Sequence, residues 1–289
     1  FSDGADSPCR SNRDELLGRA ARAAPDDVLV QWMGALEHAG GSDGIAMPEP
    51  DESIQALTRL QPDNAASWMM RLALASKRND PILAEDALAR MASSARYDDH
   101  FADTLHAWLD VSDRFPPPNF LLQPGFNQDA PEASQETLQS IAGFTSAFAQ
   151  GTATAIPAYQ ALTTYCKPGK DSVDHWQRFA YCEDVGRLML VTGKTLIARS
   201  IGFSILRNLR RNTATDQQER DNLDWYMDRM PETSGYKSGD YTAIEAYQAD
   251  WRNLDDEIEI RKRALRRAGL PDAAPAGWIR SSGSPRMTP

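Results

Sequence analysis

The sequence lacks the features that would assign it to several common protein classes. It has no run of 18 or more apolar residues, so it predicts no transmembrane helix. Three cysteines are too few for a disulfide-rich scaffold. The first residues have neither the basic nor the apolar region of a signal peptide. Because the sequence opens on Phe1 rather than methionine, we expect a processed, periplasmic or secreted chain, with a cytoplasmic protein as the alternative.

The local motifs of common enzymes are also missing. His-Glu-x-x-His, Gly-x-Ser-x-Gly and Cys-x-x-Cys do not occur. Gly193-Lys194-Thr195 matches the end of a phosphate-binding loop, but Leu188 stands where that motif requires glycine. Ser234 and Lys237 have Ser-x-x-Lys spacing in what reads as a turn rather than a helix start. The sequence therefore predicts no catalytic residue and no cofactor.

Negative charge is concentrated in the first half of the chain. Residues 1–150 hold 11 Lys+Arg and 23 Asp+Glu, a net charge of −12, and residues 151–289 hold 20 and 18, a net charge of +2. These add to the overall net charge of −10. An acidic half repels nucleic acid and attracts a basic partner, although acidic side chains also serve solubility alone.

Helical periodicity runs through most of the chain, and in the first third it repeats. The pairs Asp26-Asp27, Asp63-Asn64 and Asp98-Asp99 can each cap a helix, and they stand 37 and 35 residues apart. A short Ala/Leu/Arg-rich helix precedes each pair and a Trp-bearing helix follows it. Internal periods of this size indicate stacked helical hairpins.

The segment from Pro62 to Trp68, with Ala84 sixteen residues after the tryptophan, resembles the tetratricopeptide-type repeat of about 34 residues. Arg71 and Leu72 depart from the usual pattern. The resemblance implies an all-α protein, in which a solenoid of stacked antiparallel hairpins over 1–113 is continued by a further helical bundle. It also implies that the first helix of each hairpin lines a concave groove. The residues expected to face a partner there are Met69, Ala73, Lys77, Thr104 and Trp108.

Composition predicts the remaining boundaries. Residues 114–131 are rich in proline yet contain Phe115, so we expect a packed connector. Residues 132–271 read as an α-helical second half, and residues 272–289 as a loose tail in which Trp278 can dock. Within the second half we expect a helix from Ser134 that ends at Gly151. We also expect a helix over 173–191 that buries Trp176, and one continuous last helix from an Asp240 cap to Gly269.

Two of the cysteines can form a disulfide. If Cys182 lies about ten residues into its helix, it is ~15 Å from the helix start. An extended arm from Cys166 to Ser172 spans up to ~20 Å, so the two sulfurs can meet. The bond would imply an oxidising compartment, whereas two buried thiols would suit the cytosol. Cys9 lies near the start of the chain and is expected to be unpaired.

Two clusters of charged or metal-ligating residues have a structural alternative. His100, Asp103 and His106 fall at i, i+3 and i+6 of an expected helix and are a weak candidate metal site, although a polar helix face explains them better. The basic run Arg261–Arg267 suits a helix C-terminus, where cations offset the macrodipole. Glu257–Arg261 and Glu259–Arg263 are favourable i, i+4 pairs.

The sequence therefore favours a non-enzymatic binding or adaptor protein that engages a protein or peptide partner, expected to be basic, without nucleic acid. Bacterial exported proteins of this build include toxin inhibitors (immunity proteins) and assembly factors, and these are the analogies that the expected export suggests. The alternative is an all-α hydrolase or lyase with an acidic and histidine site drawn from Asp98, Asp99, Asp103 and His106. A third possibility is a structural domain of a larger assembly.

Overall fold

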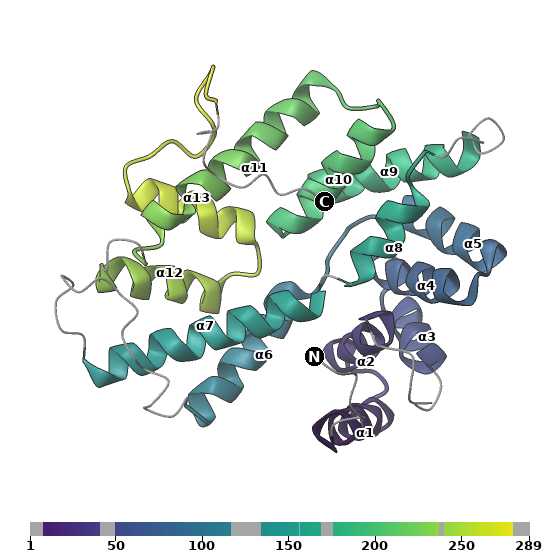
Figure 1. Cartoon of the computed structure of the whole chain (residues 1–289), viewed down its shortest axis with the longest axis horizontal. Helices are drawn as coiled ribbons and strands as arrows, with labels where there is room; N and C mark the ends of the chain where they lie inside the picture. The colour runs from purple at the N-terminus through teal and green to yellow at the C-terminus, as the bar shows by residue number, and fades with distance from the viewer. Residues whose placement is uncertain are drawn as a thin grey trace, which may run out of the picture. The chain divides into compact units, whose positions relative to one another are not determined.

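The structure, a computed structural model, describes residues 8–40, 50–116, 134–155, 157–168, 176–236 and 240–279 (Figure 1). These residues form thirteen α-helices and no β-strand, which confirms the all-α prediction. Within the same described ranges, no helix combines the length and the apolarity that a membrane span requires.

The chain divides into two compact units, and the division differs from the predicted one. Unit 1 consists of Phe1–His100 and Thr154–Leu188, and unit 2 of Phe101–Ala153 and Met189–Pro289. The predicted boundaries at residues 113 and 131 do not coincide with this division. Residues 117–131 of the predicted connector and residues 280–289 of the predicted tail lie outside the described residues.

Unit 1 is built on two helical hairpins that receive a later helix. Its helices are α1 (Pro8–Ala23), α2 (Val28–Gly40), α3 (Pro50–Leu60), α4 (Ala65–Arg78), α5 (Pro81–Ala92), α8 (Pro157–Tyr165) and α9 (Trp176–Thr192) as far as Leu188. α4 packs on α5, α2 packs on α3, and α8 contacts both α2 and α4. Asn79 ends α4 in the left-handed conformation, and Asp80 with Pro81 starts α5.

The predicted repeat register holds for helix starts but not for the third hairpin. α2, α4 and α6 (Phe101–Arg114) begin directly or shortly after the three capping pairs, with starts 37 and 36 residues apart (65 − 28 and 101 − 65). However, α6 belongs to unit 2, where Phe101, Leu105 and Leu109 lie in an aromatic core with Phe144 and Trp251. The apolar face of α6 is therefore buried in the core of unit 2, whereas the first two hairpins belong to unit 1.

Unit 2 holds two hydrophobic clusters. Its helices are α6, α7 (Gln135–Ala155) as far as Ala153, α10 (Leu196–Asn208), α11 (Ala214–Thr233), α12 (Tyr241–Asn253) and α13 (Glu257–Arg267), with the end of α9. The first cluster joins α6, α7, α12 and α13, and the second joins the end of α9 with α10, α11 and α13. Thr195 and Thr213 cap α10 and α11 through side-chain hydroxyls.

Several local predictions are wrong. α7 continues through Gly151, because one glycine weakens a helix by only about 1 kcal/mol. The expected last helix is two helices: Leu254 is extended, and the Asp256 carboxylate caps α13 by accepting from the N–H groups of Ile258 and Glu259. Trp176, the first residue of α9, is 74% exposed.

The described part of the predicted loose tail is packed. The Trp225 indole donates to the Pro271 carbonyl and the Tyr226 hydroxyl to the Asp272 carbonyl. The rings of Trp225 and Trp278 lie 5.5 Å apart. Trp278 therefore docks in unit 2.

The arginines of the basic run are held by carboxylates. Arg261 is buried and pairs with Glu257 at 2.7 Å, and Arg263 pairs with Glu259, both as the spacing predicted. Arg266 pairs with Glu259 and Asp272, and Arg267 with Asp250. Local electrostatics account for these four arginines.

The Cys166–Cys182 disulfide is present, with Cα atoms 5.7 Å apart, and it joins the end of α8 to α9. Replacing both cysteines with alanine is expected to lower the free energy of unfolding by about 3 kcal/mol, because the bond closes a loop of 16 residues. Urea unfolding followed by circular dichroism measures this change. A reductant should lower the urea midpoint of the wild-type protein and leave the midpoint of the double variant unchanged. Equal midpoints for the two proteins without reductant would contradict the expectation.

Candidate functional site

Asn64 joins two of the predicted capping pairs. Its side chain is completely buried, and its Oδ1 accepts from the N–H groups of Ala66 at 3.2 Å and Asp98 at 2.9 Å. Its Nδ2 donates to the Asp98 carbonyl and to Gln61 Oε1, both at 2.9 Å. One amide thus caps α4 and fixes the chain that leads out of α5. The Asp63-Asn64 and Asp98-Asp99 pairs, read from the sequence as separate caps, form one junction.

The Asn64→Asp substitution tests this junction. Aspartate keeps the acceptor but replaces both donors with an oxygen that faces two other oxygens. We expect the free energy of unfolding of unit 1 to fall by about 2–3 kcal/mol, as for buried polar groups that lose their partners. Denaturant unfolding of this variant is compared with Asn212→Asp, an exposed position in the turn before α11. A loss no larger than that of Asn212→Asp would show that the amide donors are dispensable.

Next to this junction lies a buried carboxylate with two tyrosines. Asp99 is 3% exposed, and the Tyr159 hydroxyl on α8 donates to it at 2.5 Å. The rings of Tyr97 and Tyr159 are 6.4 Å apart, and the Tyr97 hydroxyl donates to the Met69 sulfur on α4 at 3.4 Å. Burial, and then the Asp99 charge, raise the pKa of both tyrosines well above the usual 10.0.

This cluster makes unit 1 sensitive to alkaline pH. The folded-state pKa values of Tyr97 and Tyr159 are raised, so above pH 10 the unfolded chain loses these protons first. Stability is therefore full below about pH 10 and falls by about 1.4 kcal/mol per pH unit for each tyrosine above it. Urea unfolding at a series of alkaline pH values should show that the free energy of unfolding falls less steeply with pH in Tyr159→Phe than in the wild-type protein. Ionisation of both tyrosines near pH 10 with the fold intact, seen by ultraviolet absorbance, would contradict this.

His100 has a structural position beside this cluster. It is 4% exposed, has a φ of 51°, and lies just before α6 rather than on it. Its Nε2 donates to Gln61 Oε1 at 2.8 Å, and its ring lies 5.1 Å from that of Trp32. The left-handed backbone of His100 turns the chain between Asp99 and the first turn of α6.

The predicted metal and acid–base residues are not brought together. His106 donates from Nε2 to the Trp251 carbonyl at 2.7 Å, and Asp103 is exposed on α6. The Asp98 carboxylate accepts from the His100 N–H and lies 3.7 Å from Arg96. The i, i+3, i+6 pattern fails because His100 precedes the helix. In the described part of the chain, no group of three histidine, cysteine, aspartate or glutamate residues is arranged to hold a metal ion.

The residues expected on a concave face are divided between the units, and most are buried. Met69 and Ala73 are 1% and 4% exposed in unit 1, and Thr104 is 3% exposed in unit 2. Lys77 is exposed near the end of α4. Trp108 is half-buried and lines a pocket. An open face that contains all five residues is therefore not what the structure describes.

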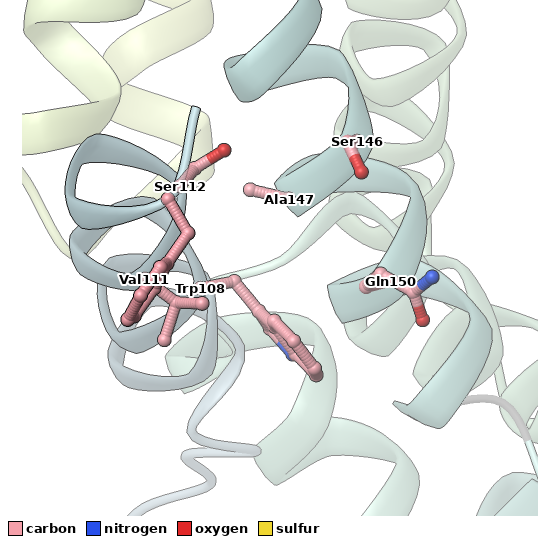
Figure 2. Close-up of a pocket in the computed structure, with 7 residues that line it drawn as sticks. Trp108, Val111, Ser112, Ser146, Ala147 and Gln150 are labelled. Atoms are coloured by element: carbon pink, nitrogen blue, oxygen red, sulfur yellow. The ribbon is translucent and has the colours of Figure 1, made fainter. Parts of the chain in front are cut away.

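The pocket lies between α6 and α7 in unit 2 and has a volume of about 220 Å³ (Figure 2). Figure 2 shows Trp108, Val111 and Ser112 on α6 facing Ser146, Ala147 and Gln150 on α7. Phe115, the seventh lining residue, is 75% exposed, and Val111 is 47% exposed. We call these seven residues the α6–α7 groove. Its lining contains no titratable side chain.

Sequence reasoning found only part of this groove. Trp108 was predicted to face a partner, whereas Phe115 was assigned to the connector. The spacings of three and four between Trp108, Val111 and Phe115 are the signal that could have joined them on one helix face. Nothing local distinguished its outward residues from core residues. The small and uncharged residues of α7 carried no signal that they would face α6.

Comparison with known proteins gives no relationship from which a function could be transferred: no family model matches the chain, and no curated protein or solved structure is significantly similar to it.

Proposed function

We propose that the protein is a non-enzymatic helical binding protein that holds an apolar side chain of a protein partner in the α6–α7 groove. The observation that carries this proposal is the exposure of Val111 and Phe115 beside a pocket lined by Trp108. Exposed apolar residues at a concave site are typical of protein–protein contacts, and tryptophan is enriched among the residues that dominate their affinity.

The lining of the groove supports binding rather than acid–base chemistry. Its polar groups are the hydroxyls of Ser112 and Ser146 and the amide of Gln150. They can orient a ligand by hydrogen bonds, whereas general acid–base catalysis needs a group that exchanges a proton near neutral pH. The candidate acids Asp99 and Asp103 do not line it.

Charge on α6 supports a basic partner. The exposed carboxylates of this helix belong to Asp103, Asp110 and Asp113, of which Asp113 already pairs with Arg252 of α12 at 2.8 Å, and Arg114 is the one exposed cation of the helix. Acidic side chains at the rim of an apolar contact accelerate association with a basic surface and contribute less to the final affinity. Raising the salt concentration should therefore slow association more than it speeds dissociation.

A disulfide between buried cysteines supports an oxidising compartment, so we place this binding protein in the periplasm or outside the cell. A tetratricopeptide-like origin of the first two hairpins fits the spacing of their helix starts. An inhibitor of a secreted toxin and an assembly factor are the roles that such a location suggests.

Charge insertion into the groove tests the function. Val111→Asp and Phe115→Asp place a carboxylate on exposed apolar positions, so both variants should fold and lose at least ~30-fold in affinity for a partner recovered with the wild-type chain. Affinity is measured by biolayer interferometry with that partner. The matched control is Ile82→Asp on α5, which alters an equally apolar, 83% exposed residue of unit 1. Recovery of no stoichiometric partner, or equal affinity for all four proteins, would overturn the proposal.

A further inference from the structure

α8 is attached to unit 1 in the way that a separate helix docks on a protein. From residue 159 onward, the side chains that it buries are those of Tyr159, Leu162 and, one residue past its end, Cys166, which are 3%, 0% and 2% exposed. They fall at i, i+3 and i+7, whereas Gln160 and Thr164 are exposed. A single stripe at this spacing is the pattern by which amphipathic helices bind grooves.

The face that receives α8 is built by residues far away in sequence. α8 contacts α2 and α4, and Figure 1 shows it beside α4. At this face the Tyr159 hydroxyl reaches the buried Asp99, and Tyr97 links the Tyr159 ring to Met69 of α4. Because the buried Asp99 carboxylate needs a hydrogen-bond donor, this face favours a helix that places a hydroxyl group there over one that does not. We call it the α2–α4 face.

The helical conformation of α8 depends on its packing against the rest of unit 1. α8 has nine residues, and isolated helices shorter than about 12–15 residues are marginal in water. The chain adds a covalent restraint, since Cys166 at the end of the stripe is bonded to Cys182 of α9. The position of this short helix is therefore fixed by its packing on α2 and α4 and by one disulfide at its end.

We propose that the α2–α4 face is a second helix-binding surface, that α8 is its built-in occupant, and that the Cys166–Cys182 bond controls the release of α8. The external partner that fits this face is an amphipathic helix with a tyrosine followed three positions later by an aliphatic residue. Its tyrosine takes the place of Tyr159 on Asp99 and its aliphatic side chain takes the place of Leu162. This surface is independent of the α6–α7 groove.

Release requires a dithiol reductant. One thiolate of the dithiol attacks a sulfur of the disulfide, which forms a mixed disulfide and releases the other cysteine as a thiolate. The second thiolate of the dithiol then attacks its own sulfur in the mixed disulfide and releases the remaining cysteine. The protein gains two electrons and two protons as Cys166 and Cys182 become thiols, and the dithiol becomes a disulfide. Because both sulfurs are buried, the attack follows a local opening of α8.

The probe is a fluorescent peptide of residues 157–168 that carries Cys166→Ala. Two full-length proteins receive the peptide. The first carries Tyr159→Phe, which weakens the binding of its own α8 to the α2–α4 face. The second carries Cys166→Ala and Cys182→Ala in addition. We expect the peptide to bind the cysteine-free protein roughly 100-fold more tightly, the factor expected from opening a loop of this length. A peptide that also carries Tyr159→Phe should bind roughly 10-fold more weakly, because it lacks the hydrogen bond to Asp99.

Equal affinity of the peptide for the two proteins, or no binding to a folded cysteine-free protein, would overturn the inference. If the cysteine-free variant fails to fold, hydrogen exchange of the wild-type chain still tests the inference. A dithiol should lower the protection of the α8 amides at least ~10-fold while the α4 and α5 amides keep theirs. Equal protection of α8 with and without the dithiol would also overturn it. Val111→Asp should leave peptide binding unchanged, so failure of the proposed function and failure of this inference can be told apart.

Discussion

The Asn64 amide is the interaction on which the arrangement of unit 1 depends. It caps α4 and simultaneously binds both backbone groups of Asp98, thirty-four residues later. With Asp98 fixed, Asp99 points into the core toward Tyr159, and His100 takes the left-handed turn that precedes α6. Burying an amide is favourable only when its donors and acceptors are satisfied, and here each has a partner. The position of α8 follows from this junction, because its tyrosine binds the carboxylate that the junction orients.

The two contact surfaces that we propose differ in kind. In unit 2 the α6–α7 groove leaves Val111 and Phe115 in solvent, where apolar surface gains free energy when a partner covers it. In unit 1 the α2–α4 face already holds α8, and a charge–hydroxyl contact gives that face selectivity.

Much of the candidate chemistry was visible in the sequence, but its role was not. Asp98 and Asp99 were predicted as a helix cap and as candidate acids, and His100 as a candidate metal ligand, whereas the structure uses each of them to build unit 1. Tyr159 gave no local signal, because its hydrogen bond to Asp99 joins segments sixty residues apart. Met69 and Ala73 have the spacing of a groove-lining stripe, yet they are buried in unit 1. A helix face has the same periodicity whether it faces a ligand or another part of its own chain.

The sequence by itself determined the helical class, most helix starts, the i, i+4 ion pairs of α13 and the feasibility of the Cys166–Cys182 bond. These depend on capping groups, side-chain spacing and chain reach, which act within a few residues or follow from covalent geometry. Tertiary structure alone decided that α6 joins the core of Phe144 and Trp251, that Leu254 interrupts the last apolar stripe, and that Val111 and Phe115 stay exposed. Burial is decided by whichever distant helix covers a face, and local pattern does not record which helix that is.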